Sequence, residues 1–199
     1  MTTPARLGVM GGSFDPPHIA HLAVASEAFH ALGLERVLFV PAAAPPHKGG
    51  GERTSAEIRL ELTSLAVDDD LRFTASAIEI ERSLVYTADT LRALDERYRG
   101  HELVFIIGSD SLLQLETWHA TDELLSRCSL AVAPRPGDSP EAIAAAVARW
   151  GDYQVLVLDV PALAVSSSDI HERVAHHRPI RYLVPQRVEQ YIQQTGLYR

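Results

Sequence analysis

Residues 7–21 read LGVMGGSFDPPHIAH, and this stretch decides the fold. A short apolar run over residues 7–10 has the length of a buried strand, and residues 18–32 have the apolar spacing of a helix. Between them, Gly11 and Gly12 let the backbone turn tightly and expose its N–H groups to a ligand. The stretch therefore predicts a strand, a turn that approaches a ligand, and a helix.

The same alternation continues along the chain. Further strand-like apolar runs occupy residues 37–40, 103–107, 130–133 and 155–158, and helical stretches occupy residues 55–67, 87–98, 111–127 and 140–150. Strands that alternate with helices form right-handed βαβ units, which build a parallel sheet covered on both faces. The sequence therefore predicts an α/β fold, a Rossmann-like doubly wound parallel sheet, with ligands bound beyond the carboxyl ends of its strands.

The C-terminal part has a different pattern. A run of serines, residues 166–168, precedes a helix over residues 169–177, and Pro185 opens a second helix over residues 186–194. These helices predict a small C-terminal helical appendage over about residues 166–199. With no repeat and no second boundary in the pattern, the whole chain, residues 1–199, is expected to form a single domain.

Composition excludes several classes of protein. The 199 residues include 26 acidic and 18 basic side chains, and the net charge of −8 does not fit a nucleic-acid or membrane-surface binder. A single cysteine, Cys128, can form neither an internal disulfide nor a thiolate zinc cluster, and we interpret it as a buried small hydrophobe. Neither a signal-peptide core nor an apolar run of 18 residues is present, so we expect a cytoplasmic protein without a membrane segment.

The first strand-to-helix junction carries two histidines. His18 and His21 are three residues apart at a helix start, so both rings should lie on one face beside the positive end of the helix. That arrangement suits a phosphate chain. An isolated pair of this spacing fits equally two surface histidines or half of a metal site. The preceding glycines match neither the Gly-x-Gly-x-x-Gly nor the P-loop pattern, so neither of those nucleotide sites is expected.

The junction resembles the signature of the nucleotidylyltransferase superfamily, Gly12-Ser13-Phe14-Asp15-Pro16-x-His18-x-x-His21. Further segments match in order and spacing: PPHK at residues 45–48, YTADTL at 86–91, FIIGSDSL at 105–112, TWH at 117–119, RPG at 135–137, SSSDI at 166–170 and GLYR at 196–199. The set is similar to the bacterial nicotinate-nucleotide adenylyltransferases. The resemblance implies that ATP and nicotinate mononucleotide react to give deamido-NAD and pyrophosphate, in NAD biosynthesis.

The resemblance also implies a site. The residues expected in catalysis are His18, His21 and Lys48. Those expected to bind ATP are Gly11, Gly12, Ser13, Phe14, Asp15, Gly108, Asp110, Ser167, Ser168 and His171. Those expected to bind nicotinate mononucleotide are Thr87, Trp118, His119 and Arg135. Mg²⁺ is implied as the cofactor, bound mainly through the phosphates of ATP rather than by a protein metal site.

Several of these residues have a plain structural interpretation as well. Asp15 either caps the histidine helix or contacts the ligand. Gly108 either lets adenosine approach closely or ends a strand, and the neighbouring Asp110 could bond a ribose or assist the metal. Trp118, expected to stack on the pyridine ring, would on its own be a core residue. A lone loop lysine such as Lys48 is usually solvated, and the serines at 167 and 168 alone would only cap a helix.

The chain departs from the family pattern at two positions. His171 stands where the closing motif usually has arginine, and histidine grips phosphate only when protonated. Arg173 cannot substitute, because two residues turn a helix by about 200°. His119 stands where tyrosine is frequent. The residues that bind the ATP phosphates and those that recognise the pyridine are therefore left open.

Other functions remain as alternatives. One is adenylyl transfer by the same fold to phosphopantetheine or to nicotinamide mononucleotide, and another is a nucleotide-binding module without catalysis, which the histidine at position 171 would suit. The expected partners are the two nucleotide substrates, with no nucleic acid and no membrane. The sequence leaves the oligomeric state open, a homo-oligomer included.

Overall fold

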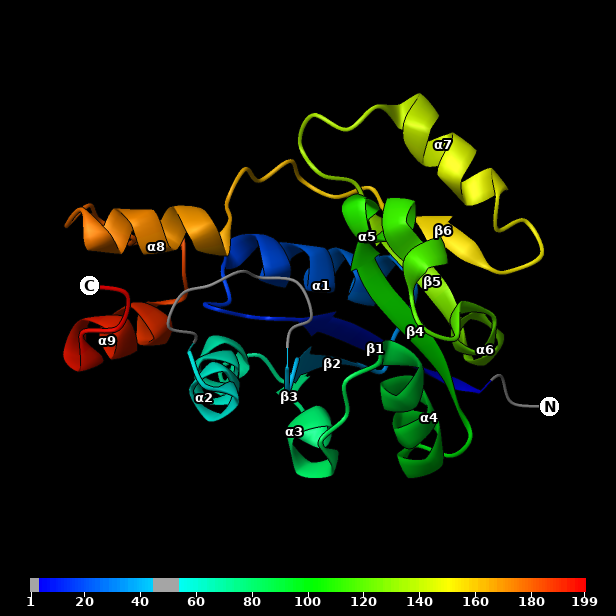
Figure 1. Cartoon of the computed structure of the whole chain (residues 1–199), viewed down its shortest axis with the longest axis horizontal. Coiled ribbons are helices and arrows are strands. Elements are labelled where there is room, and N and C mark those ends of the chain that lie inside the picture. The colour runs from blue at the N-terminus through cyan, green and yellow to red at the C-terminus, as the bar shows by residue number, and fades with distance from the viewer. Residues whose placement is uncertain (1–3, 45–53) are drawn as a thin grey trace.

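A computed structural model describes residues 4–44 and 54–199. Its centre is a six-stranded sheet of parallel strands in the order β3-β2-β1-β4-β5-β6 (Figure 1). The strands are β1 (Ala5–Gly12), β2 (Arg36–Pro41), β3 (Phe73–Ala75), β4 (His101–Gly108), β5 (Cys128–Ala133) and β6 (Val155–Val157). This order confirms the predicted doubly wound fold and places the reversal between β1 and β4, where such sheets bind ligands.

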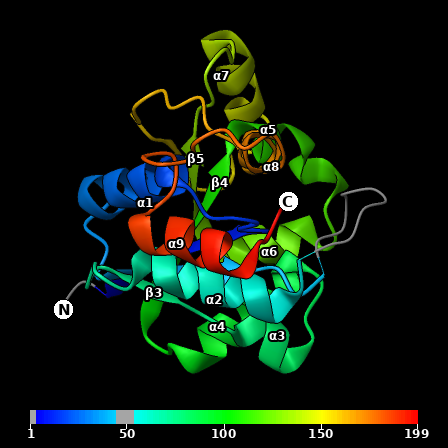
Figure 2. The same cartoon turned by 90° about the vertical axis from the view of Figure 1, so that its left-hand side faces the viewer.

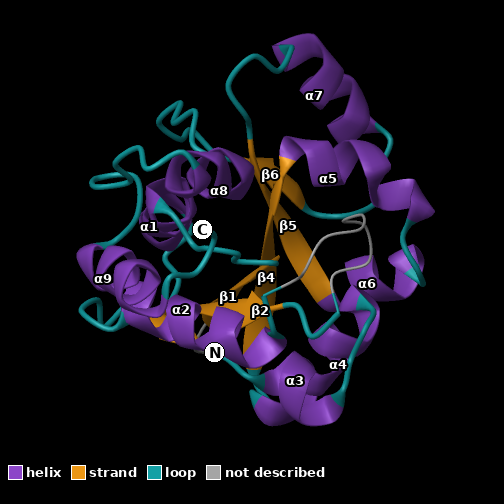
Figure 3. Cartoon of the chain, turned by 60° about the vertical axis from the view of Figure 1, so that its left-hand side comes forward, coloured by secondary structure: helices purple, strands orange, loops and turns teal. Residues whose placement is uncertain are grey.

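Helices cover both faces of the sheet (Figure 3). One face carries α1 (Ile19–Ala31), α2 (Ala56–Val67), α8 (Ser167–Ala175) and α9 (Gln186–Thr195). The other carries α3 (Ile78–Arg82), α4 (Thr87–Arg97), α5 (Ser109–Gln114), the 3₁₀ turn η1 (Leu115–Thr117), α6 (Thr121–Arg127) and α7 (Pro140–Ala148). Within the described part of the chain, no helix has the length and apolar character needed to cross a membrane.

Strand residues divide strictly between two hydrophobic cores. In β2, Val37 and Phe39 pack with α1 and α2, whereas Leu38 and Val40 pack with the helices of the opposite face. Successive side chains of a strand point to opposite faces, so a strand buried on both faces reads as a continuous apolar run. This is why the apolar runs alone were enough to predict the long strands.

The C-terminal helices are part of the main core. Ile170 of α8 and Val188 and Ile192 of α9 are at most 1% exposed and belong to the same cluster as β1 and β2. α9 packs beside α2, and the C-terminus lies near α8 and α9 (Figures 1 and 2). The predicted helical part at 166–199 is therefore present, and it is built into the domain.

Three local features differ from the sequence prediction. The strand β3 and the helix α3 were not predicted, because Thr74 interrupts the apolar residues of β3 and a helix of five residues is too short to show periodicity. The single helix expected over 111–127 is wrong. It divides into α5, η1 and α6 because Trp118 is extended and Ala120 adopts the left-handed conformation, with φ of 52°. The Thr121 hydroxyl donates to the carbonyl of Trp118 at 3.0 Å and stabilises this break.

Candidate active site

The site is at the carboxyl ends of β1 and β4, which are neighbours in the sheet. β1 ends at Gly12 and β4 ends at Gly108, so the two predicted glycine turns are brought to one edge. A Cβ atom at position 108 would lie 2.5 Å from Oδ1 of Asp110 and 3.2 Å from Nε of Arg135. Glycine is therefore required there for the two charged side chains to approach the strand end.

The two histidines lie together at the start of α1, as predicted. Their rings stack with centroids 3.7 Å apart, and His18 is only 6% exposed. The backbone N–H of His18 donates to Nδ1 of His21 at 3.2 Å. Since Nδ1 accepts, the proton of the neutral His21 ring is on Nε2, which makes this atom a donor.

Asp15 does not cap α1, so one of its two predicted roles is wrong. The N-cap of that helix is His18. The Asp15 carboxylate instead accepts the hydroxyl of Tyr198 at 2.5 Å and lies 3.8 Å from Nε2 of His171. Burial opposes ionisation of Asp15, but hydrogen bonds from His171, Tyr198 and Thr54 outweigh it and lower the pKa of the carboxyl below its usual value. Burial and the negative charge of Asp15 raise the pKa of Tyr198.

His171 and Ser167 contact the first loop of the site. Nε2 of His171 donates to the carbonyl of Asp15 at 2.8 Å, and the hydroxyl of Ser167 donates to the carbonyl of Pro16 at 3.0 Å. Ser168, also predicted to bind phosphate, is exposed at the start of α8. The predicted ATP-binding residues of α8 thus lie beside the loop that follows β1, and two of them bind its backbone.

The role of a buried arginine was not predicted from the sequence. Arg59 of α2 is 3% exposed and donates to the carbonyls of Ser13 at 2.9 Å, Ala42 at 2.6 Å and Thr54 at 3.2 Å. Burial lowers the pKa of its guanidinium, and nearby carboxylates partly oppose that shift. The side chain joins the loop after β1 to the loop after β2. An isolated arginine in a helical pattern gives no sign of such a role.

Lys48 lies outside the described residues, and its role stays a prediction. The preceding chain is held at Ala43, whose N–H donates to Oε2 of Glu79 at 3.2 Å. The other oxygen of Glu79 accepts the Thr90 hydroxyl at 2.8 Å. Burial raises the pKa of Glu79 above its usual value, although these hydrogen bonds oppose the shift.

Asp110 and Arg135, predicted to serve different substrates, form an ion pair of 2.9 Å. Both side chains are about half exposed, at 49% and 60%. The backbone of Arg135 is fixed because its N–H donates to Oδ2 of Asp138 at 2.8 Å, and Asp138 also accepts the hydroxyl of Ser109. The pair lies at the ends of β4 and β5, on the same edge as the glycine turns.

The predicted pyridine site lies at the start of α4. Thr87 is the first residue of this helix, and the ring of the preceding Tyr86 lies 4.2 Å from the ring of His119. Trp118 is half-buried and its ring meets Phe105 edge-on at 6.2 Å. Tyr86 was not predicted for the site, and the structure places it against His119 and directly before the predicted Thr87.

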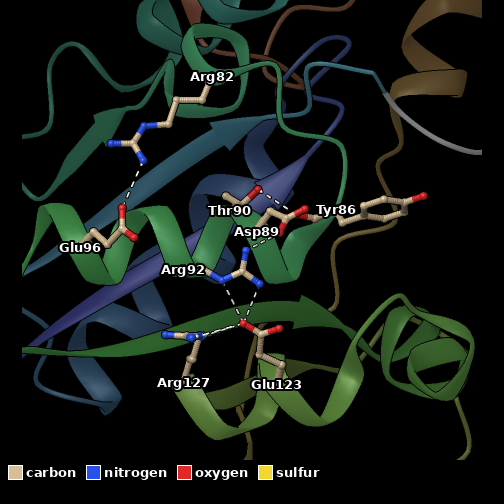
Figure 4. A network of polar contacts seen from close by, with 8 residues as sticks. All are labelled: Arg82, Tyr86, Asp89, Thr90, Arg92, Glu96, Glu123 and Arg127. Carbon is tan, nitrogen blue, oxygen red and sulfur yellow. Dashed lines mark hydrogen bonds and ion pairs between the residues drawn. The ribbon is translucent and has the colours of Figure 1, made fainter.

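Ion pairs fix α4 against α6 behind this site. Arg92 donates to Asp89 at 2.7 Å and to Glu123 at 2.6 Å, and Arg127 pairs with Glu123 at 3.2 Å. Figure 4 shows this network below α4, with the Tyr86 ring directed away from it. The pairs join α4 to α6, the helix that follows Trp118 and His119 in the chain. In residues 4–44 and 54–199, no group of three or more His, Cys, Asp and Glu side chains could hold a metal ion.

Comparisons with known proteins identify the family of the chain. Residues 9–173 match the model of the cytidylyltransferase-like family. Probable nicotinate-nucleotide adenylyltransferases of Desulfitobacterium hafniense (strain Y51) and Exiguobacterium sibiricum are each 45% identical to the chain, with 97–98% of both sequences covered. The structure of a Plasmodium falciparum nicotinic acid mononucleotide adenylyltransferase complexed with NaAD matches the fold with a TM-score of 0.80 at 18% identity, covering 98% of this chain and 97% of that one. The chain belongs to the cytidylyltransferase-like family and, within it, to the nicotinate-nucleotide adenylyltransferases.

Proposed function

We propose that this chain transfers AMP from ATP to nicotinate mononucleotide, giving deamido-NAD and pyrophosphate. The observation that carries the proposal is the stacked pair of His18 and His21 at the start of α1, directly after the glycine turn of β1. Full-length identity of 45% to nicotinate-nucleotide adenylyltransferases supports the same reaction.

The reaction needs positioning and charge neutralisation more than a base. The phosphate of nicotinate mononucleotide is already ionised near neutral pH. One of its oxygens attacks the α-phosphorus of ATP, the bond from that phosphorus to the bridging oxygen breaks, and pyrophosphate leaves with the electron pair. We assign His18, Nε2 of His21 and Lys48 to the charge that develops on the phosphates, as predicted from the sequence.

The ATP site is proposed along the edge formed by β1 and β4. The N–H groups of residues 11–14 would face the phosphates, and Gly108 would let the adenosine approach the end of β4. Ser168 is the hydroxyl of α8 left for the phosphate tail, since the Ser167 hydroxyl and Nε2 of His171 already bind the loop. Nδ1 of His171 would donate to a phosphate only in the protonated ring, because the neutral ring has its single N–H at Nε2.

Mg²⁺ is proposed to arrive with ATP. A hard cation of this kind keeps several waters and is held by phosphate oxygens and one or two carboxylates. Asp110 is a half-exposed carboxylate at the end of β4 and fits that donor set. When bound there, the ion would offset negative charge on the pyrophosphate, while Arg135, released from Asp110, would bind the phosphate of the mononucleotide.

For the pyridine, we propose the start of α4. The backbone N–H groups at Thr87 are donors beside the positive end of an 11-residue helix, which suits a carboxylate. Trp118 offers a ring face for stacking, and His119 together with Tyr86 would border the pyridine.

A pyrophosphate-release assay tests the proposal. The purified chain is mixed with ATP, Mg²⁺ and one acceptor at a time, nicotinate mononucleotide or phosphopantetheine, and His18→Ala provides the catalytically impaired control. We expect rapid release with the mononucleotide only, abolished by EDTA. Release with phosphopantetheine, or binding of ATP without turnover, would instead support one of the two alternative functions.

A further inference from the structure

The loop that follows β1 contains carbonyl groups that require hydrogen-bond donors from other parts of the chain. The carbonyls of Asp15 and Pro16 each precede a proline, so these two peptide units have an acceptor but no N–H donor. Toward a bound polyanion, these two peptide units would present only the partial negative charge of their carbonyl oxygens. An unpaired carbonyl in such a place is costly, and it would also repel phosphate.

Side chains from distant parts of the chain supply those donors. His171 binds the carbonyl of Asp15 and Ser167 binds that of Pro16, while Arg59 binds that of Ser13. Because the N–H and C=O of one peptide point in opposite directions, a bond to the Ser13 carbonyl directs the next N–H to the other side, toward the proposed phosphates. The loop is therefore oriented through its carbonyls.

Asp15 places a carboxylate in the same loop. A negative charge beside the phosphates of ATP would weaken their binding unless it were engaged elsewhere. The hydroxyl of Tyr198 lies 2.5 Å from Oδ1 of Asp15, although the two residues are 183 positions apart in sequence. The same Tyr198 ring stacks on His171 with centroids 3.9 Å apart and an angle of 23°, which orients Nε2 of His171 toward the Asp15 carbonyl.

We propose that Tyr198, in the C-terminal GLYR segment, is a positioning residue for ATP. It acts through Asp15 and His171, which it holds so that the loop after β1 presents its N–H groups and His18 to the phosphates. The proposal rests on the function proposed above, but its central readout, the affinity for ATP alone, does not depend on which acceptor the protein uses.

The test compares two tyrosine-to-phenylalanine variants. Tyr198→Phe removes the hydroxyl bond to Asp15 and keeps the ring on His171. Tyr191→Phe removes a similar hydroxyl bond, from Tyr191 to Glu61 at 3.0 Å, on the neighbouring helix α9 and away from the loop. The Kd for ATP with Mg²⁺ is measured calorimetrically on the full chain, and KM for both substrates is measured by pyrophosphate release.

We expect Tyr198→Phe to raise Kd and KM for ATP about tenfold, the value of one hydrogen bond to a charged group, and to leave KM for the mononucleotide within about twofold. Tyr191→Phe should change neither constant by more than about twofold. ATP constants within twofold of wild type in Tyr198→Phe, or an equal loss in both variants, would overturn the proposal. If nicotinate mononucleotide is not a substrate but Tyr198→Phe still weakens ATP binding, only the proposed reaction fails.

A double-mutant cycle tests the route through the carboxylate. Asp15→Asn removes the negative charge that the Tyr198 hydroxyl engages. On that background, Tyr198→Phe should weaken ATP binding by less than about threefold, because the two groups act through one another. Fully additive losses would show that Tyr198 does not act through Asp15 and would contradict the proposal. The cycle also keeps the test valid if Tyr198→Phe lowers the melting temperature.

Discussion

Replacing Arg59 with methionine should lower the free energy of unfolding more than a comparable substitution at the surface. The substitution keeps an aliphatic chain of similar length in α2 and removes four hydrogen bonds, three at 2.6–3.2 Å to the carbonyls of Ala42, Ser13 and Thr54 and a longer one of 3.5 Å to that of Ala43. Each bond from a charged donor is worth about 1.5–3 kcal/mol, and removal leaves partly buried carbonyls without this partner. The guanidinium is itself costly to bury, so the terms partly cancel, and we expect the free energy of unfolding to fall by about 3–5 kcal/mol.

The measurement is urea and thermal unfolding followed by circular dichroism. For a chain of this length, 1 kcal/mol corresponds to about 2–4 °C, so the melting temperature should fall by about 6–20 °C. Arg149→Met is the matched control, because Arg149 is 62% exposed and pairs only with the exposed Glu116 among the residues described. Its loss should cost at most about 1 kcal/mol. Equal melting temperatures for the two variants would refute the assigned role of Arg59.

Three further predictions follow from the site. His18→Ala should lower kcat by about 10²–10³ with a much smaller change in the apparent affinity for ATP, because the proposed role of the ring is to stabilise charge that grows in the transition state. An almost normal kcat in the pyrophosphate assay would show that the role of the motif is structural. Gly108→Ala should displace Asp110 and raise KM for ATP severalfold, while it changes the free energy of unfolding by less than about 1 kcal/mol. Unchanged kinetic constants would show that Asp110 is not part of the ATP site. Burial raises the pKa of Cys128 to about 12, so the thiol stays protonated at pH 8 and should react with iodoacetamide on the order of 10³-fold more slowly than free cysteine; alkylation at the rate of free cysteine would contradict this burial.

The strands and the histidine pair could be predicted because their signals are local. Continuous apolar runs mark β1, β2 and β4, which are buried on both faces. The spacing of His18 and His21 fixes their common face on α1 without any tertiary information. The fold and the first half of the site therefore follow from short segments of sequence.

The remaining features depend on contacts between distant residues. Arg59 is identified as a loop-binding residue only when Ser13 and Ala42, 46 and 17 positions away, are placed around it. Tyr198 meets Asp15 across 183 positions. The break at Ala120 escaped prediction because the left-handed residue there is neither glycine nor asparagine, the usual signal.

Competition between the two pyridine mononucleotides tests the central claim most directly. Equal concentrations of nicotinate and nicotinamide mononucleotide are incubated with ATP, Mg²⁺ and the protein, and the two dinucleotide products are separated and quantified over time. In the proposed site, the N–H donors at the start of α4 would pair with a carboxylate, whereas the amide nitrogen would leave one unpaired at a cost of about 1–3 kcal/mol, so deamido-NAD should form about 5–150-fold faster than NAD. Equal rates, or faster formation of NAD, would contradict the account.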